Sequence, residues 1–165
     1  MSRVIVCGYW QSPLKQLIYG LKYYRAKPIA KSLGQLLANN ARLAGVDKAI
    51  LVLPVPLHRG RLWDRGFNQS DLLAQEVASQ LNLPLKRFLV RKKSTRPQFG
   101  LGRSARQDNL AGAFDVLARY SNDVVGQTIL LVDDVITTGA TLNECAKVLK
   151  TKGAREVWGL VLAKA

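Results

Sequence analysis

Two adjacent carboxylates, Asp133 and Asp134, stand directly after an apolar run and before a short segment of small and hydroxyl-bearing residues. The segment consists of Val135, Ile136, Thr137, Thr138, Gly139, Ala140 and Thr141. We expect the apolar run over 128–132 to form a buried strand and residues 141–152 to form the helix that follows. Ligands of open α/β sheets bind where the carboxyl ends of the strands meet. The two acids are therefore predicted to face a binding site.

The segment from Val135 to Thr141 is predicted to hold a phosphate group. A loop that enters a helix N-terminus presents backbone N–H groups and the positive end of the helix dipole. Carboxylates only accept hydrogen bonds, so Asp133 and Asp134 would serve hydroxyl groups or a metal ion. A phosphate site beside acceptors for neighbouring hydroxyls is typical of a ribose 5-phosphate. The alternative is a strand–turn–helix junction whose acids only cap the helix, for which one Asp would suffice.

Two other nucleotide-binding patterns are absent from the sequence. It contains no Gly-x-x-x-x-Gly-Lys of the P-loop type, and no Gly-x-Gly-x-x-Gly follows a strand. The acidic motif is therefore the main chemical signal.

The charge of the chain predicts an anionic ligand or partner. Lys and Arg number 25 against 11 Asp and Glu, a net charge of +14. The positive charges gather in two stretches without acids, residues 1–46 and 77–107. Nucleic acid, a membrane surface or a phosphorylated small molecule would match this charge. The alternative is a well-solvated basic surface.

The order of apolar segments predicts one α/β domain over residues 1–165, with a mainly parallel central sheet. This length suits a single core. Residues 54–67 and 94–112 are predicted to be loops, and residues 1–46 are predicted to be helical. We expect helices over 13–24, 29–43 and 70–81, and strands over 49–53, 85–90, 113–117 and 157–162 besides the strand over 128–132.

Cysteine and histidine usage excludes several classes of protein. Two cysteines cannot build a disulfide scaffold or a four-cysteine zinc site, and His58 is the single histidine. The apolar run after Arg3 is too short for a secretory signal, and no segment approaches the length of a membrane span. We therefore expect a cytoplasmic protein that does not insert into a membrane.

The run from Ile129 to Thr141 resembles the phosphoribosyl-pyrophosphate (PRPP) binding motif of type I phosphoribosyltransferases. The rest of the chain resembles the competence protein F (ComF) family, which includes GntX-like members. The matching segments are Pro54 to Arg59, Arg65 to Gln69, Leu21-Lys22-Tyr23, Thr95 with Gln98, Leu101, and the run from Arg106 through Asn109 to Phe114. The resemblance covers nearly the whole chain. Many family members carry an N-terminal zinc module with four cysteines, and this sequence begins where that module would end.

The resemblance implies a type I phosphoribosyltransferase fold, with a central, mainly parallel sheet flanked by helices. It also implies a small N-terminal hood over residues 1–46 and a flexible loop over 91–112. Asp133 and Asp134 would be the catalytic acids that contact the ribose 2- and 3-hydroxyls, with Mg²⁺ nearby as cofactor. The residues from Val135 to Thr141 would hold the 5-phosphate.

Two further groups of residues follow from the resemblance. The loop after the strand over 49–53 would bind pyrophosphate through Leu57, His58, Arg59, Arg61 and Arg65, since arginine binds such oxygens in bidentate fashion. The flexible loop would bring Arg96, Arg103 and Arg106 to the pyrophosphate, from the same subunit or from the partner in a homodimer. The alternatives are a basic surface loop and a disordered basic loop.

The resemblance leaves two functions open. The first is a phosphoribosyltransferase that binds PRPP with Mg²⁺, transfers phosphoribosyl to an unidentified acceptor and serves DNA uptake in natural transformation. The second is a non-catalytic protein that senses PRPP or binds single-stranded DNA as the partner of an ATP-driven competence translocase. Both predict a basic surface, so the charge does not choose between them.

Overall fold

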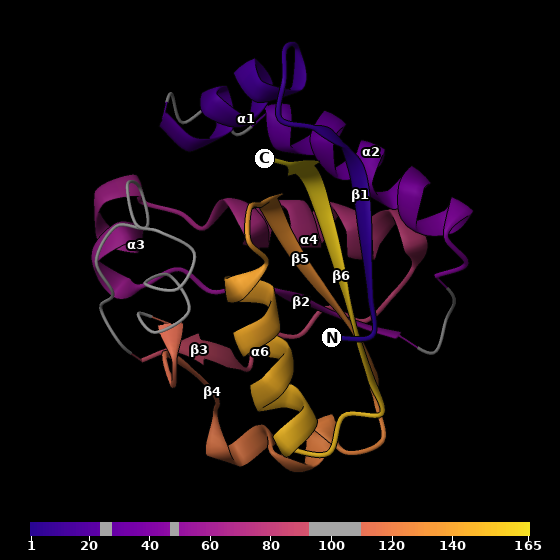
Figure 1. The fold of residues 1–165 in the computed structure, drawn as a ribbon, viewed down its shortest axis with the longest axis vertical. Helices are drawn as coiled ribbons and strands as arrows, with labels where there is room; N and C mark the ends of the chain where they lie inside the picture. Colours follow the sequence, from indigo (N-terminus) through magenta and orange to yellow (C-terminus); the bar gives the residue numbers. More distant parts are fainter. Residues whose placement is uncertain (24–27, 47–49, 93–109) are drawn as a thin grey trace.

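The computed structural model of the chain describes residues 1–23, 28–46, 50–92 and 110–165. Within these ranges the core of the fold is a four-stranded parallel sheet in the order β1-β6-β5-β2 (Figure 1). Its strands are β1 (Arg3–Tyr9), β2 (Ile50–Pro54), β5 (Thr128–Ile136) and β6 (Glu156–Lys164). Two shorter strands, β3 (Leu89–Arg91) and β4 (Phe114–Val116), pair in antiparallel fashion.

Helices cover both faces of the parallel sheet. One face packs against α1 (Leu14–Tyr23), α2 (Ile29–Leu43) and α4 (Gln69–Leu81). The other face packs against α6 (Ala140–Thr151) and the β3–β4 pair (Figure 1). A short helix, α3 (Arg59–Arg65), follows β2, and two 3₁₀ turns cover Ala118–Tyr120 and Asn122–Val124. The predicted α/β architecture with a parallel central sheet is confirmed.

Strand β5 is buried on both faces because its side chains alternate between two apolar clusters. Leu130 and Val132 pack toward α2 and α4, whereas Ile129 and Leu131 pack toward α6, and all four are fully buried. Successive side chains of a strand point to opposite faces, so a central parallel strand requires a continuous apolar run. The sequence of this strand meets that requirement up to Asp133.

The parallel arrangement brings the carboxyl ends of β2, β5 and β6 to one edge of the sheet. Val132 of β5 pairs with Pro54 of β2 and with Leu160 of β6. The N–H of Val55 donates to the carbonyl oxygen of Val132 at 2.9 Å, so the segment after β2 stays beside β5. Residues that follow these two strands are thereby placed next to each other.

The structure corrects four details of the predicted elements. Residues 3–9 form an edge strand, so the segment over 1–46 is not wholly helical. The predicted loop over 54–67 contains α3, which ends at Gly66 in a left-handed conformation with φ 75°. Strand β3 is displaced toward the end of the predicted 85–90, where Leu85 makes only a single bridge to Val52. Strand β5 continues through both acids to Ile136.

Two further predictions concern the flexible loop and membrane crossing. Most of the flexible loop predicted over 91–112 lies outside the described residues. A membrane-crossing helix was not expected, and no helix within the described part of the chain is both long and apolar enough to cross a bilayer.

Gly34 on α2 gives a test of the helix packing on one face of the sheet. A methyl group at Gly34 would overlap Cβ and Cγ of Glu76 on α4. We expect Gly34→Ala to lower the free energy of unfolding by roughly 1–3 kcal/mol, because overpacking outweighs the better helix propensity of alanine. Urea unfolding measures the change, with Ser32→Ala at an exposed position of the same helix as control. Unchanged or increased stability of Gly34→Ala would show that α2 and α4 do not approach this closely.

Candidate functional site

A pocket of about 410 Å³ opens at the carboxyl edge of the parallel sheet. Its floor is the end of β5 with the loop into α6, and its walls come from α1, from the segment after β2 and from the start of α4. The acidic pair and the predicted phosphate loop both line it. The lining comprises residues 10, 19, 22, 23, 55–57, 61, 65, 69, 70, 91, 133–142 and 165.

Asp133 is held by two hydrogen bonds to one of its carboxylate oxygens. The hydroxyl of Ser70 donates to Oδ1 at 2.9 Å, and the backbone N–H of Asp134 donates to the same oxygen at 2.9 Å. Ser70 is almost fully buried at the start of α4. The carboxylate therefore has a fixed orientation at the pocket floor.

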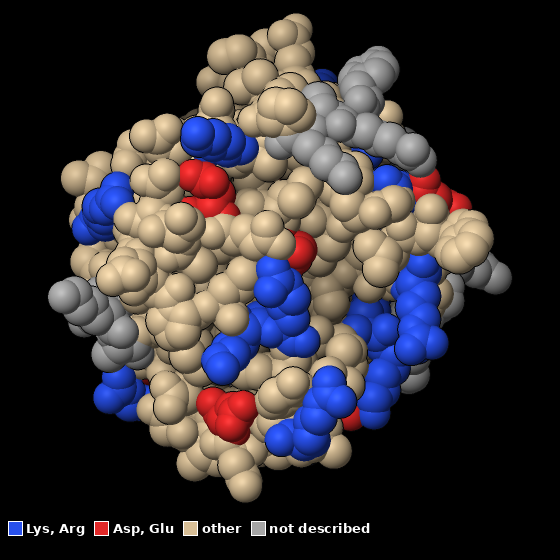
Figure 2. Space-filling view, turned by 180° about the vertical axis from the view of Figure 1, so that it is seen from behind, with Lys and Arg blue, Asp and Glu red and all other residues tan. Residues whose placement is uncertain are grey.

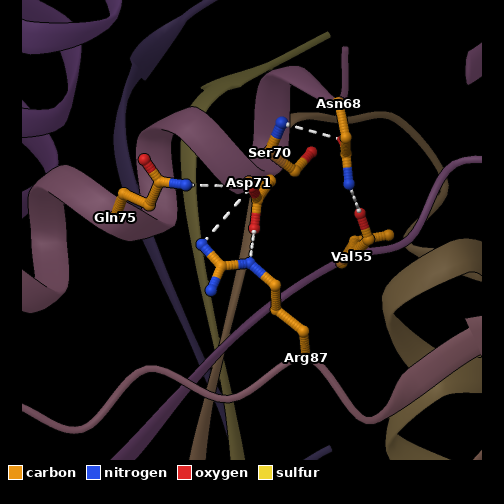
Figure 3. A network of polar contacts seen from close by, with 6 residues as sticks. All are labelled: Val55, Asn68, Ser70, Asp71, Gln75 and Arg87. Atoms are coloured by element: carbon orange, nitrogen blue, oxygen red, sulfur yellow. Dashed lines mark hydrogen bonds and ion pairs between the residues drawn. The ribbon is translucent and has the colours of Figure 1, made fainter.

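A polar network fixes the first turn of α4 and with it Ser70 (Figure 3). The Asn68 side chain accepts from the N–H of Ser70 at 3.1 Å and donates to the carbonyl oxygen of Val55 at 3.0 Å. On the next residue, Asp71 accepts from Arg87 Nε at 2.6 Å and from Gln75 Nε2 at 3.1 Å. Asn68 is the N-cap of this helix. The helix start is thus tied to the segment after β2.

The side chain of Asp134 has a different partner from that of Asp133. Its Oδ1 forms an ion pair with Lys22 Nζ of α1 at 2.9 Å, with side chains exposed by only 6% and 17%. Its Oδ2 is buried and has no hydrogen-bond partner within the described part of the chain. A buried carboxylate oxygen without a partner destabilises the fold, because it has lost its hydrogen bonds to water and has formed none within the protein. Asp134 Oδ2 is therefore an unsatisfied acceptor beside the pocket.

The pKa of Asp133 is shifted by its surroundings. Burial and the neighbouring charge of Asp134 raise the pKa of Asp133 from 3.8 to about 7, although the hydrogen bonds from the Asp134 N–H and Ser70 oppose the rise. Burial penalises the charged form of a carboxyl, and a nearby like charge does the same. Asp133 therefore changes protonation state near neutral pH.

All seven residues of the predicted phosphate loop line the pocket. Val135 and Ile136 end β5, and Gly139 precedes α6 in a left-handed conformation with φ 77°, which favours glycine. The Thr138 hydroxyl accepts from the N–H of Ala140 at 3.4 Å. The segment therefore runs from the end of β5 through a glycine turn into α6, and its role in phosphate binding stays a prediction.

The predicted pyrophosphate residues divide into two groups. Leu57, Arg61 and Arg65 line the pocket, whereas His58 and Arg59 do not. His58 instead caps α3, with Nδ1 accepting from the N–H of Gly60 at 3.2 Å. Their roles in pyrophosphate binding remain predictions. The predicted loop residues Arg96, Arg103 and Arg106 lie outside the described residues.

The structure adds Arg91 to the basic side of the pocket. It ends β3, lies on the lining, and its guanidinium stands 5.4 Å from the Phe114 ring centroid. Burial and the nearby charge of Arg61 lower the pKa of Arg91. The sequence signal was the basic stretch over 77–107, which did not single out this residue.

An aromatic wall of Trp10, Tyr19 and Tyr23 closes one side of the pocket. The rings of Trp10 and Tyr19 are 5.6 Å apart and those of Tyr19 and Tyr23 are 5.4 Å apart, between centroids. The Arg65 guanidinium lies 5.4 Å from the Tyr23 ring. Tyr19, Lys22 and Tyr23 share one face of α1 at helical spacing, opposite the apolar stripe. That spacing is the feature of the sequence that could have indicated a pocket-lining face on this helix.

The donor set of the pocket fits a cation that takes few protein ligands. No group of three or more His, Cys, Asp and Glu residues gathers anywhere within the residues that the structure describes. Asp133 and Asp134 are the acidic side chains on the lining, and Asp134 Oδ2 has no partner within the described residues. Mg²⁺ is often bound through one or two carboxylates, with phosphate and water completing its shell. The two acids would hold it in that way.

Comparison with known proteins places the chain among relatives over nearly its whole length. The phosphoribosyl transferase domain family matches residues 69–165. Competence protein F of Haemophilus influenzae is 39% identical, over 98% of this chain and 73% of that protein. DNA utilization protein YhgH of Escherichia coli K12 is 36% identical, over 96% and 71%.

Two solved structures share the fold. Glutamine PRPP amidotransferase from Bacillus subtilis, complexed with ADP and GMP, superposes with a TM-score of 0.53 at 21% identity, over 79% of this chain and 25% of that one. A hypothetical protein from Neisseria gonorrhoeae with bound ppGpp superposes with a TM-score of 0.52 at 15% identity, over 99% and 73%. The predicted fold class is confirmed by these likenesses together with the family match.

The raised pKa of Asp133 predicts a pH-dependent cost to stability. Between about pH 4 and pH 7 the folded chain keeps a proton on Asp133 that the unfolded chain releases, so this group's contribution to stability is lost as pH rises. We expect Asp133→Asn, which cannot ionise, to become more stable relative to the native chain between about pH 5 and about pH 8. Urea unfolding at both pH values measures the difference. A difference that is equal at both values would contradict the raised pKa.

Proposed function

The chain belongs to the ComF family of phosphoribosyl transferase domain proteins, and we propose that its pocket binds PRPP together with Mg²⁺. One observation carries the proposal. The acidic pair and the loop before α6 line the same pocket, so acceptors for hydroxyls and donors for phosphate face one ligand. Arg61 and Arg65 add positive charge on the same lining.

A bound PRPP would span the pocket. Its 5-phosphate would meet the turn before α6, where Gly139 and the threonine hydroxyls supply donors. Its ribose hydroxyls would meet Asp133 and Asp134, and its pyrophosphate would meet Leu57, Arg61 and Arg65, with Arg91 beside them. Arginine pairs with phosphate oxygens in bidentate fashion, which favours these side chains for the pyrophosphate end.

Transfer of the phosphoribosyl group would break the bond between ribose C1 and pyrophosphate. The transition state resembles an oxocarbenium ion, so the ring must be fixed and the leaving group neutralised. Asp133, oriented by Ser70, would fix the ring through its hydroxyls. Arg61 and Arg65 would neutralise the leaving pyrophosphate. When bound, Mg²⁺ would supply further positive charge to the pyrophosphate oxygens.

We propose that the protein is located in the cytoplasm and that its biological role is in DNA uptake. The curated relatives bear the names competence protein F and DNA utilization protein, and they align over almost the entire chain. We propose that PRPP binding serves this role, with a competence translocase as partner and a homodimer as the assembled form.

Calorimetric titration of PRPP with Mg²⁺ tests the site. We expect saturable binding to the native chain and at least about tenfold weaker binding to Asp133→Asn/Asp134→Asn, because each amide replaces one accepting oxygen with an NH₂ donor. Asp123→Asn, an exposed acid outside the pocket, is the matched control and should bind like the native chain. Binding that survives unchanged in the double variant would refute the assignment of the acids.

A second candidate function, binding of single-stranded DNA, rests on the aromatic wall. Tyr19 and Tyr23 are 41% and 61% exposed although they stack on each other, and Arg65 lies against Tyr23. Proteins that bind single strands combine stacking rings with arginine and lysine. The basic charge alone does not locate a track, since Lys and Arg form several separate groups on the face in Figure 2. The wall therefore supplies the location.

Fluorescence anisotropy with a labelled oligothymidine tests this second function. We expect Tyr23→Ala to weaken binding about tenfold through loss of base stacking. Affinity should also fall steeply from low to moderate salt. Tyr9→Ala removes an exposed ring outside the pocket and serves as control. Equal affinity of the Tyr23→Ala and Tyr9→Ala variants would exclude the wall as the binding surface.

A further inference from the structure

The ion pair between Lys22 and Asp134 joins α1 to the acidic end of β5 on the lining of the pocket. Lys22 Nζ lies 2.9 Å from Asp134 Oδ1, and both side chains are largely withdrawn from water. The same ammonium lies 5.8 Å from the ring centroid of Trp10 on the aromatic wall. A positive group of the chain itself therefore already neutralises one of the two acids.

The ion pair of Lys22 is not what holds α1 against the core. Ile18 and Leu21 are fully buried and fix α1 on the core, whereas Tyr19 and Tyr23 stand on the pocket side with Lys22. The helix thus has an apolar anchor that does not depend on the ion pair. Loss of the ammonium would leave α1 in place and leave Asp134 without its counter-charge.

Asp134 is a divided carboxylate. One oxygen is paired with the ammonium, and the other is buried without a partner in the described part of the chain. A carboxylate that served only as a structural partner of Lys22 would be expected to have both oxygens satisfied. The unpaired oxygen indicates a site completed by something that binds there.

We propose that Lys22 is a specificity-determining residue that competes with a divalent cation for Asp134. In the unliganded chain its ammonium takes the place of the metal. A ligand that brings its own divalent cation, such as a metal-bound sugar pyrophosphate, exchanges that cation for the ammonium. A cation that arrives alone must break the same ion pair without the added contacts of a phosphate or a sugar. The site therefore discriminates against free metal and in favour of a metal–phosphate complex.

The strength of the competition depends on the fraction of molecules in which the ion pair between Lys22 and Asp134 is broken. Apparent affinity falls by the fraction of molecules that are competent to bind. If the pair is closed in about nine-tenths of the molecules, free cation binds about tenfold more weakly than it would to an unpaired Asp134. This inference deepens the proposed function because it concerns the same pocket, but it can be measured without PRPP.

Binding of Mn²⁺ in the absence of PRPP tests the proposal, because Mn²⁺ takes the same oxygen ligands as Mg²⁺ and can be followed by electron paramagnetic resonance. We expect Lys22→Met to bind Mn²⁺ about tenfold or more tightly than the native chain. Lys15→Met, which removes an exposed charge from the same helix outside the pocket, should leave Mn²⁺ affinity unchanged. Asp134→Asn added to Lys22→Met should abolish the gain.

Further variants keep the test decisive. Lys22→Arg retains a cation and should keep the native affinity for Mn²⁺. Lys22→Gln removes the charge but keeps a hydrogen-bond donor, and it replaces Lys22→Met if thermal melting shows that the methionine variant does not fold. No gain in either neutral variant, or an equal gain in Lys15→Met, would overturn the proposal.

The outcomes also separate this inference from the proposed function. A native chain that fails to bind PRPP, together with a gain of Mn²⁺ affinity in Lys22→Met, would refute the proposed ligand and leave the competition intact. PRPP binding by the native chain without any gain in the neutral Lys22 variants would do the reverse.

Discussion

Two like charges at the end of one buried strand are the constraint on which the rest of the site depends. Asp133 and Asp134 are consecutive residues of β5, and both line the same pocket. Each carboxylate meets a different neighbour. Ser70 at the start of α4 holds Asp133, and Lys22 of α1 holds Asp134. The site is therefore assembled by the two helices that contact these carboxylates, together with the strand that carries them.

The parallel sheet makes this assembly possible. Because β2 and β5 run in the same direction, the segment after β2 and the loop after β5 emerge at one edge. Asn68 then joins the two, since it caps α4 and also binds the carbonyl oxygen of Val55. A small displacement of this turn would move Ser70 away from Asp133. The position of the acid thus depends on a helix cap that does not itself line the pocket.

The parts of the site that are contiguous in sequence could be predicted, and the parts formed by tertiary contacts could not. The path from Ile129 to Thr141 follows from an apolar strand, two acids and a glycine turn. The contacts of Lys22 and Ser70 required the packing of helices far away in the chain. Edge strand β1 was missed because exposed and buried positions do not alternate regularly along it. Helix α3 was missed because its glycine and arginine residues are equally typical of a basic loop.

The pairing of β1 with β6 has a consequence for how the chain acquires its shape. Arg3 stands beside Trp158, and the two strands come from opposite ends of the described chain. During synthesis β1 has no β6 to pair with until residues 156–164 have left the ribosome. Contacts of such long sequence separation slow folding and leave an apolar edge open in the meantime. Of the described strands, β6 comes last in the sequence and lies between β1 and β5, so the four-stranded sheet is complete only after β6 has been made.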